Sequence, residues 1–187
     1  MQVWEAFILL VVIMDPVVSI AALMSLSGGG RQERKAIIKK AFCVAVFVFL
    51  IFAVAGDAVL RVLGVEFESF KVAGGIILVI LGIQLALGIT KPKKENVSET
   101  AVVIGTPLIS GPAVIMTTMI LVKEIGIYST LAAGIGALLV VLASLLLASR
   151  ITGLMGRGGL KVLSTMMGMV TVAWGIQFIF SGVLGML

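Results

Sequence analysis

The amino-acid sequence predicts an all-α integral membrane protein with six transmembrane helices. We expect two inverted three-helix repeats, with helices 1 and 4 interrupted at mid-membrane. Three features predict this fold class: the composition, a series of long apolar stretches, and a pattern that recurs in the two halves. Of the 187 residues, 60% are hydrophobic and 12% are charged, whereas soluble domains carry roughly 45–50% apolar and about 25% charged residues.

The long apolar stretches are the predicted membrane spans. They are residues 6–26, 41–56, 72–90, 100–122, 125–149 and 162–187. A helix needs about 20 mostly apolar residues to cross a bilayer, and the last four stretches reach about this length without a charge. The shorter stretch at 41–56 still qualifies, because Lys39 and Lys40 can extend their ammonium groups to the membrane surface.

Helix 1 contains a carboxylate and a helix breaker near its middle, at Asp15 and Pro16. Aspartate is favoured at helix N-caps and proline at the first helical position, so the pair predicts that a second half-helix begins there. A carboxylate near the centre of a membrane helix is unfavourable by about 2.5–3.5 kcal/mol on insertion scales, and such residues usually mark function. The stretch lacks the basic n-region of a signal peptide, so we expect it to remain in the mature protein.

Lysine and arginine residues gather in alternate loops, which predicts how the helices are oriented. All but three of these 14 residues lie in the first, third and fifth loops; the exceptions are Arg61, Lys71 and Lys123. Short basic loops stay in the cytoplasm. We therefore expect a multi-pass protein of the cell membrane (plasma or inner membrane) with both termini outside.

Helices 3 and 6 carry matching residues, which indicates an internal repeat. The segments GGIILVILGIQLALG (74–88) and MGMVTVAWGIQFIFS (167–181) share glycine and glutamine positions at an offset of 93. The residues expected to pack at the repeat interface are Gly74, Gly75, Gly82, Gln84, Gly168, Gly175 and Gln177. Repeats of three helices cross the membrane in opposite senses, as in many secondary transporters. We expect a single transmembrane domain over 1–187, with repeat 1 at 1–90, a cytoplasmic loop at 91–99 and repeat 2 at 100–187.

Helix 4 is interrupted at the position that corresponds to Asp15 and Pro16. Gly105, Pro107, Gly111 and Pro112 break its middle, and proline removes a backbone donor. Two interrupted segments at corresponding positions of two repeats are the best sequence indication of a transport site. Inverted repeats would direct the second half-helices toward opposite faces. Their positive N-terminal ends would then meet near the bilayer centre and favour a carboxylate.

The predicted substrate site lies at these two interruptions. Its residues are Asp15, Pro16, Ser19, Thr106, Ser110, Gly111, Pro112 and Thr117. Asp15 beside two helix N-termini could hold an ammonium group, so the site fits a small zwitterion such as an amino acid. Asp15 is also the candidate for proton coupling. Two other interpretations stay open: Asp15 only caps a kinked helix, and the hydroxyl groups are ordinary contacts between helices.

The residue types that the chain lacks exclude several functions. It has no histidine and a single cysteine, Cys43, which argues against disulfides, haem and most transition-metal sites. We therefore expect no metal, no cofactor and no enzymatic activity, and we expect Cys43 to be a small buried hydrophobe. The basic loops explain the net charge of +5, so the expected partner is membrane lipid rather than nucleic acid. A homo-oligomer stays open.

Four segments resemble the MarC family of small prokaryotic membrane proteins. They are the Asp15-Pro16 pair, LGVEFESFKVAGGIIL (63–78), TPLISGPAVIMTT (106–118) and MGMVTVAWGIQFIFSGV (167–183). The resemblance covers nearly the whole chain. It implies six helices and proton-coupled transport, in the direction of export, of small neutral amino acids such as glycine, alanine, serine or threonine. At Val18 and Ala21 the chain lacks the glycine and proline that the family often has after the Asp-Pro pair.

The predicted function is a secondary transporter of small neutral amino acids that works by alternating access. Two alternatives stay open. A passive channel or efflux pore would require rings of polar or charged side chains along its pore, and the sequence offers one acid within a span. A membrane subunit without transport activity would make Asp15 dispensable.

Overall fold

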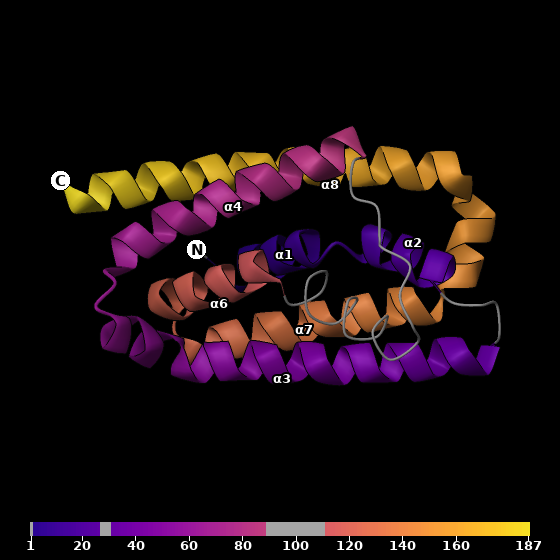
Figure 1. Cartoon of the computed structure of the whole chain (residues 1–187), viewed down its shortest axis with the longest axis horizontal. Helices are drawn as coiled ribbons and strands as arrows, with labels where there is room; N and C mark the ends of the chain where they lie inside the picture. The colour runs from indigo at the N-terminus through magenta and orange to yellow at the C-terminus, as the bar shows by residue number, and fades with distance from the viewer. Residues whose placement is uncertain (1, 27–30, 89–110) are drawn as a thin grey trace.

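The computed structural model of the chain describes residues 2–26, 31–88 and 111–187, and every regular element in these ranges is an α-helix (Figure 1). Five helical segments in these ranges are long and apolar enough to cross a membrane. The prediction of an all-α membrane protein is therefore confirmed for this part of the chain. The predicted loop at 91–99 and the first half of the predicted span at 100–122 lie outside the described residues.

Short connections join most of the helices. The helices are α1 (Val3–Met14), α2 (Pro16–Leu26), α3 (Arg31–Leu63), α4 (Phe67–Leu87), α6 (Pro112–Ile125), α7 (Ile127–Leu146) and α8 (Ala148–Met186). α3 begins at Arg31, well before the predicted span at 41–56, because the segment RQERKAIIKK consists mostly of good helix formers. α8 also begins before its predicted span, and it bends at Gly156, where the backbone is not helical.

Helices from the two halves of the chain lie side by side. α3 lies along α7 and α4 lies along α8, while α1 and α2 lie between these two pairs and contact both α7 and α8 (Figure 1). The C-terminus lies at one end of the molecule and α1 begins on the same side, so we call this end the N-terminal end. α2 ends and α3 begins at the opposite end, which we call the basic end. The bundle thus places the helix 1 segment at its centre.

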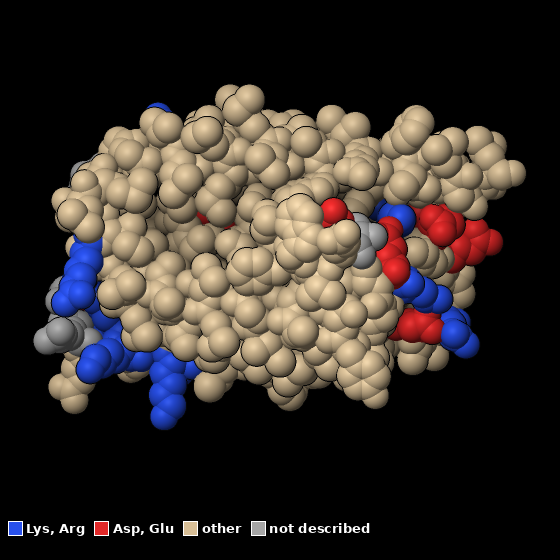
Figure 2. All heavy atoms as spheres, turned by 180° about the vertical axis from the view of Figure 1, so that it is seen from behind, with Lys and Arg blue, Asp and Glu red and all other residues tan. Residues whose placement is uncertain are grey.

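Charged residues distinguish the two ends. The basic end carries Arg34, Lys35, Lys39, Lys40, Arg150 and Lys161. On the face drawn in Figure 2 this end shows basic side chains alone, whereas the N-terminal end shows basic and acidic side chains together. The band between the two ends is almost entirely uncharged on this face. This distribution is what a membrane protein with one strongly basic surface would show.

The uncharged band is formed by exposed apolar side chains. Phe47, Val54, Leu139 and Phe180 are all more than half exposed, as is usual for side chains that face lipid. Cys43 is also exposed on α3, so the prediction that it is buried is wrong. It lies on the side of α3 that does not pack against other helices of the bundle, where a small apolar residue needs no cover in lipid.

Four glycines form the contact between α4 and α8, which we call the glycine seam: Gly75, Gly82, Gly168 and Gly175. A Cβ atom built at Gly75 would lie 2.5 Å from the carbonyl oxygen of Gly175, and one at Gly82 would lie 2.6 Å from that of Gly168. The two backbones therefore touch. Small residues that allow this approach are a common source of helix association in membranes. The pairing also shows that α4 and α8 are antiparallel.

α3 and α7 pack through an aromatic ring and a glycine. Phe49 on α3 is almost fully buried, and a Cβ atom built at Gly134 on α7 would overlap its ring. Near the start of α3, Arg34 Nη1 donates a hydrogen bond at 3.2 Å to Ser149 Oγ, at the start of α8, just after α7 ends at Leu146. These contacts show that α3 and α7 are also antiparallel.

We expect Gly134→Ala to lower the free energy of unfolding of the detergent-solubilised protein by about 1–3 kcal/mol, the usual cost of inserting a carbon into a packed site. Phe49→Leu should restore part of this loss in the double variant, because it removes the overlapping ring atoms. Thermal unfolding followed by size-exclusion chromatography measures both effects. Gly153→Ala is the control, since no atom lies within 4 Å of a Cβ there. An unchanged Tm for Gly134→Ala would contradict this packing.

Candidate functional site

The break in helix 1 occurs at Asp15, which separates α1 from α2. Its backbone has φ 39° and ψ 80°, and it is the only residue other than glycine with a positive φ in the described ranges. The Asp15 N–H donates to the carbonyl oxygen of Val12 at 3.2 Å, which ends α1. Aspartate and asparagine enter this left-handed conformation more readily than other side chains. Asp15 is therefore suited to end a helix.

The same residue begins the next helix. Asp15 Oδ1 accepts hydrogen bonds from the N–H groups of Val17 and Val18, each at 3.0 Å, and the Asp15 carbonyl oxygen accepts one from Ser19 N–H at 3.1 Å. Pro16 occupies the first position of α2, where its missing N–H is not needed. The N-terminus of α2 is thus satisfied by its own carboxylate, through one oxygen only.

Three buried side-chain oxygens in the described part of the chain have no hydrogen-bond partner: Asp15 Oδ2, Ser19 Oγ and Thr117 Oγ1. Asp15 is 5% exposed, and Ser19 and Thr117 are fully buried. Buried polar atoms are normally paired, and each exception calls for an explanation. All three belong to residues that the sequence places at the predicted substrate site.

Other buried threonines show how such a hydroxyl is ordinarily satisfied. Thr118 donates to the carbonyl oxygen of Val114 at 2.7 Å, and Thr130 and Thr171 make the same bond to the carbonyl four residues earlier. Thr117, the neighbour of Thr118, lies in the same helix and makes no such bond. Its hydroxyl is therefore a free polar group inside the core, available to a ligand.

The N-terminus of α6 differs from that of α2, because its cap has no side chain. Gly111 is the N-cap, and the first hydrogen bond of the helix runs from Ile115 N–H to the carbonyl oxygen of Gly111 at 3.1 Å. Pro112 has no N–H. The N–H groups of Ala113 and Val114 precede the first helical bond and point out of the helix end, where they favour an anion.

The two half-helices run in opposite directions from their starting points. α2 runs toward the basic end, and α6 runs toward the N-terminal end (Figure 1). α6 packs against α1. The buried residues next to the two starting points, Met14 and Ile20 on one side and Ala113 and Val114 on the other, belong to one continuous apolar core. The breaks at Asp15 and Gly111 therefore face the same core.

The remaining predicted residues are placed as follows. Thr106 and Ser110 lie outside the described residues. Gly74 packs against Met116 of α6, and the other four glycines form the glycine seam. Gln84 and Gln177 are both exposed. Gln84 lies at the end of the seam where Thr165 bonds the carbonyl oxygen of Ala86, and Gln177 lies near the opposite end, so the seam does not pair them with each other.

Two ion pairs at the N-terminal end are not predicted by the sequence. Lys71 Nζ on α4 lies 2.6 Å from Glu124 Oε1 on α6, and Lys123 Nζ lies 2.9 Å from Asp57 Oδ1 on α3. Lys71 is a buried lysine, 9% exposed. Lys71 is one of the three basic residues outside the strongly basic loops, and this unusual position is the signal in the sequence that marks it. Its partner, Glu124, becomes visible only in the fold.

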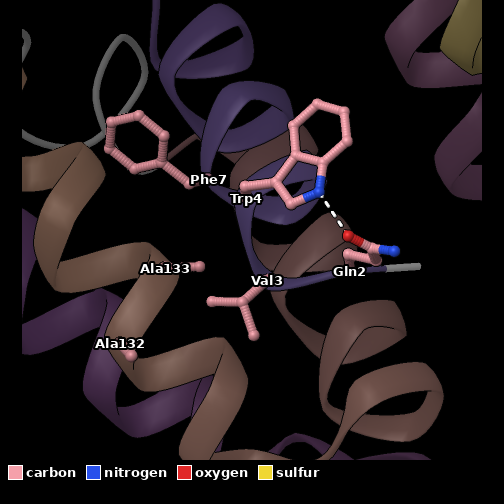
Figure 3. Close-up of a pocket in the computed structure, with 6 residues that line it drawn as sticks. All are labelled: Gln2, Val3, Trp4, Phe7, Ala132 and Ala133. Atoms are coloured by element: carbon pink, nitrogen blue, oxygen red, sulfur yellow. Dashed lines mark hydrogen bonds between the residues drawn. The ribbon is translucent and has the colours of Figure 1, made fainter.

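A surface hollow of about 590 Å³ lies elsewhere, at the N-terminal end between α1 and α7 (Figure 3). Its lining is mostly apolar: Gln2, Val3, Trp4, Phe7, Ala132 and Ala133. Trp4 Nε1 donates to Gln2 Oε1 at 2.5 Å across its rim. Indole rings of this kind are enriched at membrane surfaces. The hollow contains none of the unpartnered oxygens, so we do not assign the substrate site to it.

Comparisons with known proteins give the family. The family described as MarC family integral membrane protein matches the chain over residues 1–187. A UPF0056 membrane protein of Pyrococcus horikoshii is 32% identical, over 92% of this chain and 90% of its own length. One of Methanocaldococcus jannaschii is 29% identical, over 84% of this chain and 83% of its own length. The inner membrane protein YhgN of Escherichia coli is 28% identical, over 97% of this chain and 96% of its own length. No solved structure matches the chain.

Proposed function

The chain belongs to the MarC family of integral membrane proteins, and we propose that it is a secondary transporter of small neutral amino acids. One observation supports this most strongly: Asp15 Oδ2 is buried at the break between two half-helices and has no partner. A buried carboxylate that keeps one oxygen unpaired is costly. An unpaired carboxylate oxygen inside a membrane span is suited to bind a cation reversibly.

Asp15 would bind the ammonium group of the substrate. Its Oδ1 is already engaged by the N–H groups of Val17 and Val18, which fixes the orientation of the carboxylate and leaves Oδ2 for a ligand. An ammonium carries three donors. The hydroxyl oxygens of Ser19 and Thr117, which also lack partners, would accept the others or bind a polar substrate side chain.

The substrate carboxylate would bind at the N-terminus of α6. The N–H groups of Ala113 and Val114 are the donors there, and Gly111 has no side chain with which to cap them. α2 cannot take this role, because Asp15 already satisfies its first N–H groups. The proposed site therefore uses one half-helix for each end of a zwitterion. This differs from the sequence-based expectation, in which both helix N-termini hold the carboxylate.

The surroundings favour a substrate with no net charge. Met14, Ile20 and Val114 are almost fully buried, and they belong to the apolar core that contains both breaks. Among the described residues, Asp15 is the one charged group near the middle of a candidate span. A substrate with a second cationic or anionic group would find no counter-charge in this core.

Proton coupling follows from competition for one oxygen. A proton and an ammonium group cannot both occupy Asp15 Oδ2, so each would displace the other. Entry of protons from the outside would then drive the substrate outward. The strongly basic end would face the cytoplasm, because short basic segments remain there, and both termini would face outside.

Alternating access is supported by the pattern of helix contacts. α2 contacts α7 and α8, and α6 contacts α3 and α4 in addition to α7 and α1. Exchange of the two predicted repeats converts the first pair of contacts into the second. The same exchange swaps α3 with α7 and α4 with α8, so it leaves each of these two helix pairs unchanged. Such a relationship is expected of inverted repeats that rock against each other around a central site.

Counterflow in reconstituted vesicles tests the proposed function. Vesicles loaded with unlabelled alanine and diluted into labelled alanine should accumulate the label transiently above its equilibrium level, because a carrier exchanges substrate for substrate. Internal glycine, serine or threonine should also support the overshoot, and arginine or glutamate should not. A channel would equilibrate the label without an overshoot. Absence of any overshoot with all the neutral amino acids would overturn the proposal.

A further inference from the structure

Two ion pairs fasten the far end of α6 to the first half of the chain. Glu124 pairs with Lys71 of α4 at 2.6 Å, and the preceding residue, Lys123, pairs with Asp57 of α3 at 2.9 Å. Lys123 Nζ also lies 5.5 Å from the centre of the Phe67 ring. The proposed substrate site uses none of these side chains. They lie at the N-terminal end, where Figure 2 shows acidic and basic side chains together.

α6 is bounded by a glycine at each end. Gly111 precedes it, and Gly126 follows it with φ 82°, a conformation that other residues rarely adopt. No atom lies within 4 Å of a Cβ built at Gly126, so the chain is open at this point. Residues at the ends of elements commonly act as hinges for rigid movements. α6 is therefore a 14-residue half-helix that can change its tilt as a unit.

The packing of α6 is softer than that of the glycine seam. Met116 packs against Gly74 of α4, and Met119 packs against Gly56 of α3. Methionine has three rotatable bonds and adapts to a shifted neighbour, whereas the seam joins α4 to α8 backbone against backbone. Of these two contacts, the methionine contact made by α6 is the one more able to adapt, and the two ion pairs add polar contacts that hold the far end of α6 at the N-terminal end.

α6 carries both a residue of the proposed site, Thr117, and the two residues that form the ion pairs at the N-terminal end. Thr117 lies about two helical turns before Glu124, and the anion-binding start of the helix lies farther in. We propose that α6 is a gate at the N-terminal end of the transporter, and that the Lys71–Glu124 ion pair holds this gate closed. The inference rests on the proposed function for the meaning of the gate, but its test needs no substrate.

Labelling of a buried cysteine tests the gate. In a Cys43→Ala background, Thr117→Cys provides a single thiol at a fully buried position. A membrane-impermeant thiol reagent is added to the outside of right-side-out vesicles, and the initial labelling rate is measured. Lys71→Gln and Glu124→Gln should each raise this rate by about tenfold, a change in the open population that loss of one partly buried ion pair can produce.

Two further variants separate gating from general damage. The exchange Lys71→Glu with Glu124→Lys restores an ion pair and should return the rate toward that of the parent. Arg61→Gln is the control: it removes the Arg61–Asp57 pair within α3, at 2.8 Å, but keeps both side chains of the Asp57–Lys123 pair and should leave the rate unchanged. Only variants that are monodisperse and have the Tm of the parent are compared. If the exchanged pair does not fold, Lys71→Gln and Glu124→Gln still decide the question.

The outcomes are distinct. Unchanged labelling in both neutral variants, or an equal increase in Arg61→Gln, would overturn the gate. Faster labelling in the neutral variants, together with no counterflow by the unaltered protein, would support a moving α6 and reject the transport of neutral amino acids. Counterflow by the unaltered protein, without a labelling change in the neutral variants, would keep the transporter and reject this gate.

Discussion

Asp15→Asn is expected to reduce counterflow of labelled alanine roughly 10- to 100-fold, because a charge-assisted hydrogen bond to a buried group contributes about 1.5–3 kcal/mol. Asparagine is nearly the same size and keeps an oxygen at the position of Oδ1, so Val17 and Val18 retain their hydrogen bonds. The substitution therefore removes the charge and leaves the break in helix 1 in place. Initial rates of exchange in reconstituted vesicles measure the effect.

Asp15→Ala supplies the comparison that separates the two roles of Asp15. Alanine cannot cap α2, which costs about 1 kcal/mol, and it does not favour the left-handed backbone at φ 39°. We expect Asp15→Ala to lower the Tm as well as the exchange rate, whereas Asp15→Asn should keep the Tm. If Asp15→Asn exchanged alanine at the rate of the unaltered protein while Asp15→Ala did not, Asp15 would be only a helix cap.

Gly82→Leu and Gly175→Leu are expected to have the largest effect on folding. A Cβ at Gly82 would lie 2.6 Å from the carbonyl oxygen of Gly168, and one at Gly175 would lie 2.7 Å from that of Gly75. Backbone atoms cannot turn aside as a side chain can, so α4 and α8 would have to separate. We expect a loss of at least about 3 kcal/mol, the upper end of the usual cost of overpacking, and little monodisperse protein in detergent.

The control for the seam lies on the same helix. Gly153→Leu introduces the same side chain into α8 at a position where no atom lies within 4 Å of the Cβ. It should leave the yield and the Tm nearly unchanged. Stable, monodisperse Gly82→Leu protein would show that the helices are farther apart than the structure places them.

The sequence was sufficient for the features that a membrane makes costly. A carboxylate and a proline in an apolar stretch have few uses in lipid, which is why Asp15 and Pro16 identify the break between α1 and α2. Likewise, glycines that recur at Gly75 and Gly82 and at Gly168 and Gly175 have no side chain to contribute. Close backbone contact is the main structural use left to them, and the structure brings these glycines together in pairs.

Features that depend on tertiary contacts could not be predicted in this way. Lys71 and Glu124 are 53 residues apart, and no local pattern joins them. Gln84 and Gln177 match as well as the glycines do in sequence, yet both are exposed, because a shared offset does not say which way a side chain faces. Cys43 was assigned to the core from its residue type, but lipid allows apolar residues to remain uncovered.

The helix ends at the site show the same limit. In the sequence, Asp15-Pro16 and Gly111-Pro112 are two versions of one helix start. In the structure they differ, because the Asp15 side chain turns back to satisfy the N-terminus of α2, while Gly111 has no side chain with which to cap α6. This difference, which depends on one rotamer, is what gives the proposed site a separate place for each end of the substrate.

Equilibrium binding by the purified protein tests the proposed site most directly. The ligands are alanine, lactate, which has a hydroxyl in place of the ammonium, and alaninamide, which lacks the carboxylate. We expect the unaltered protein to bind alanine at least about tenfold more tightly than either analogue, since each lost charge-assisted contact is worth 1.5 kcal/mol or more. Asp15→Asn should no longer bind alanine more tightly than lactate, but it should still bind alanine more tightly than alaninamide. Equal discrimination against lactate in Asp15→Asn and in the unaltered protein would contradict an ammonium site at Asp15.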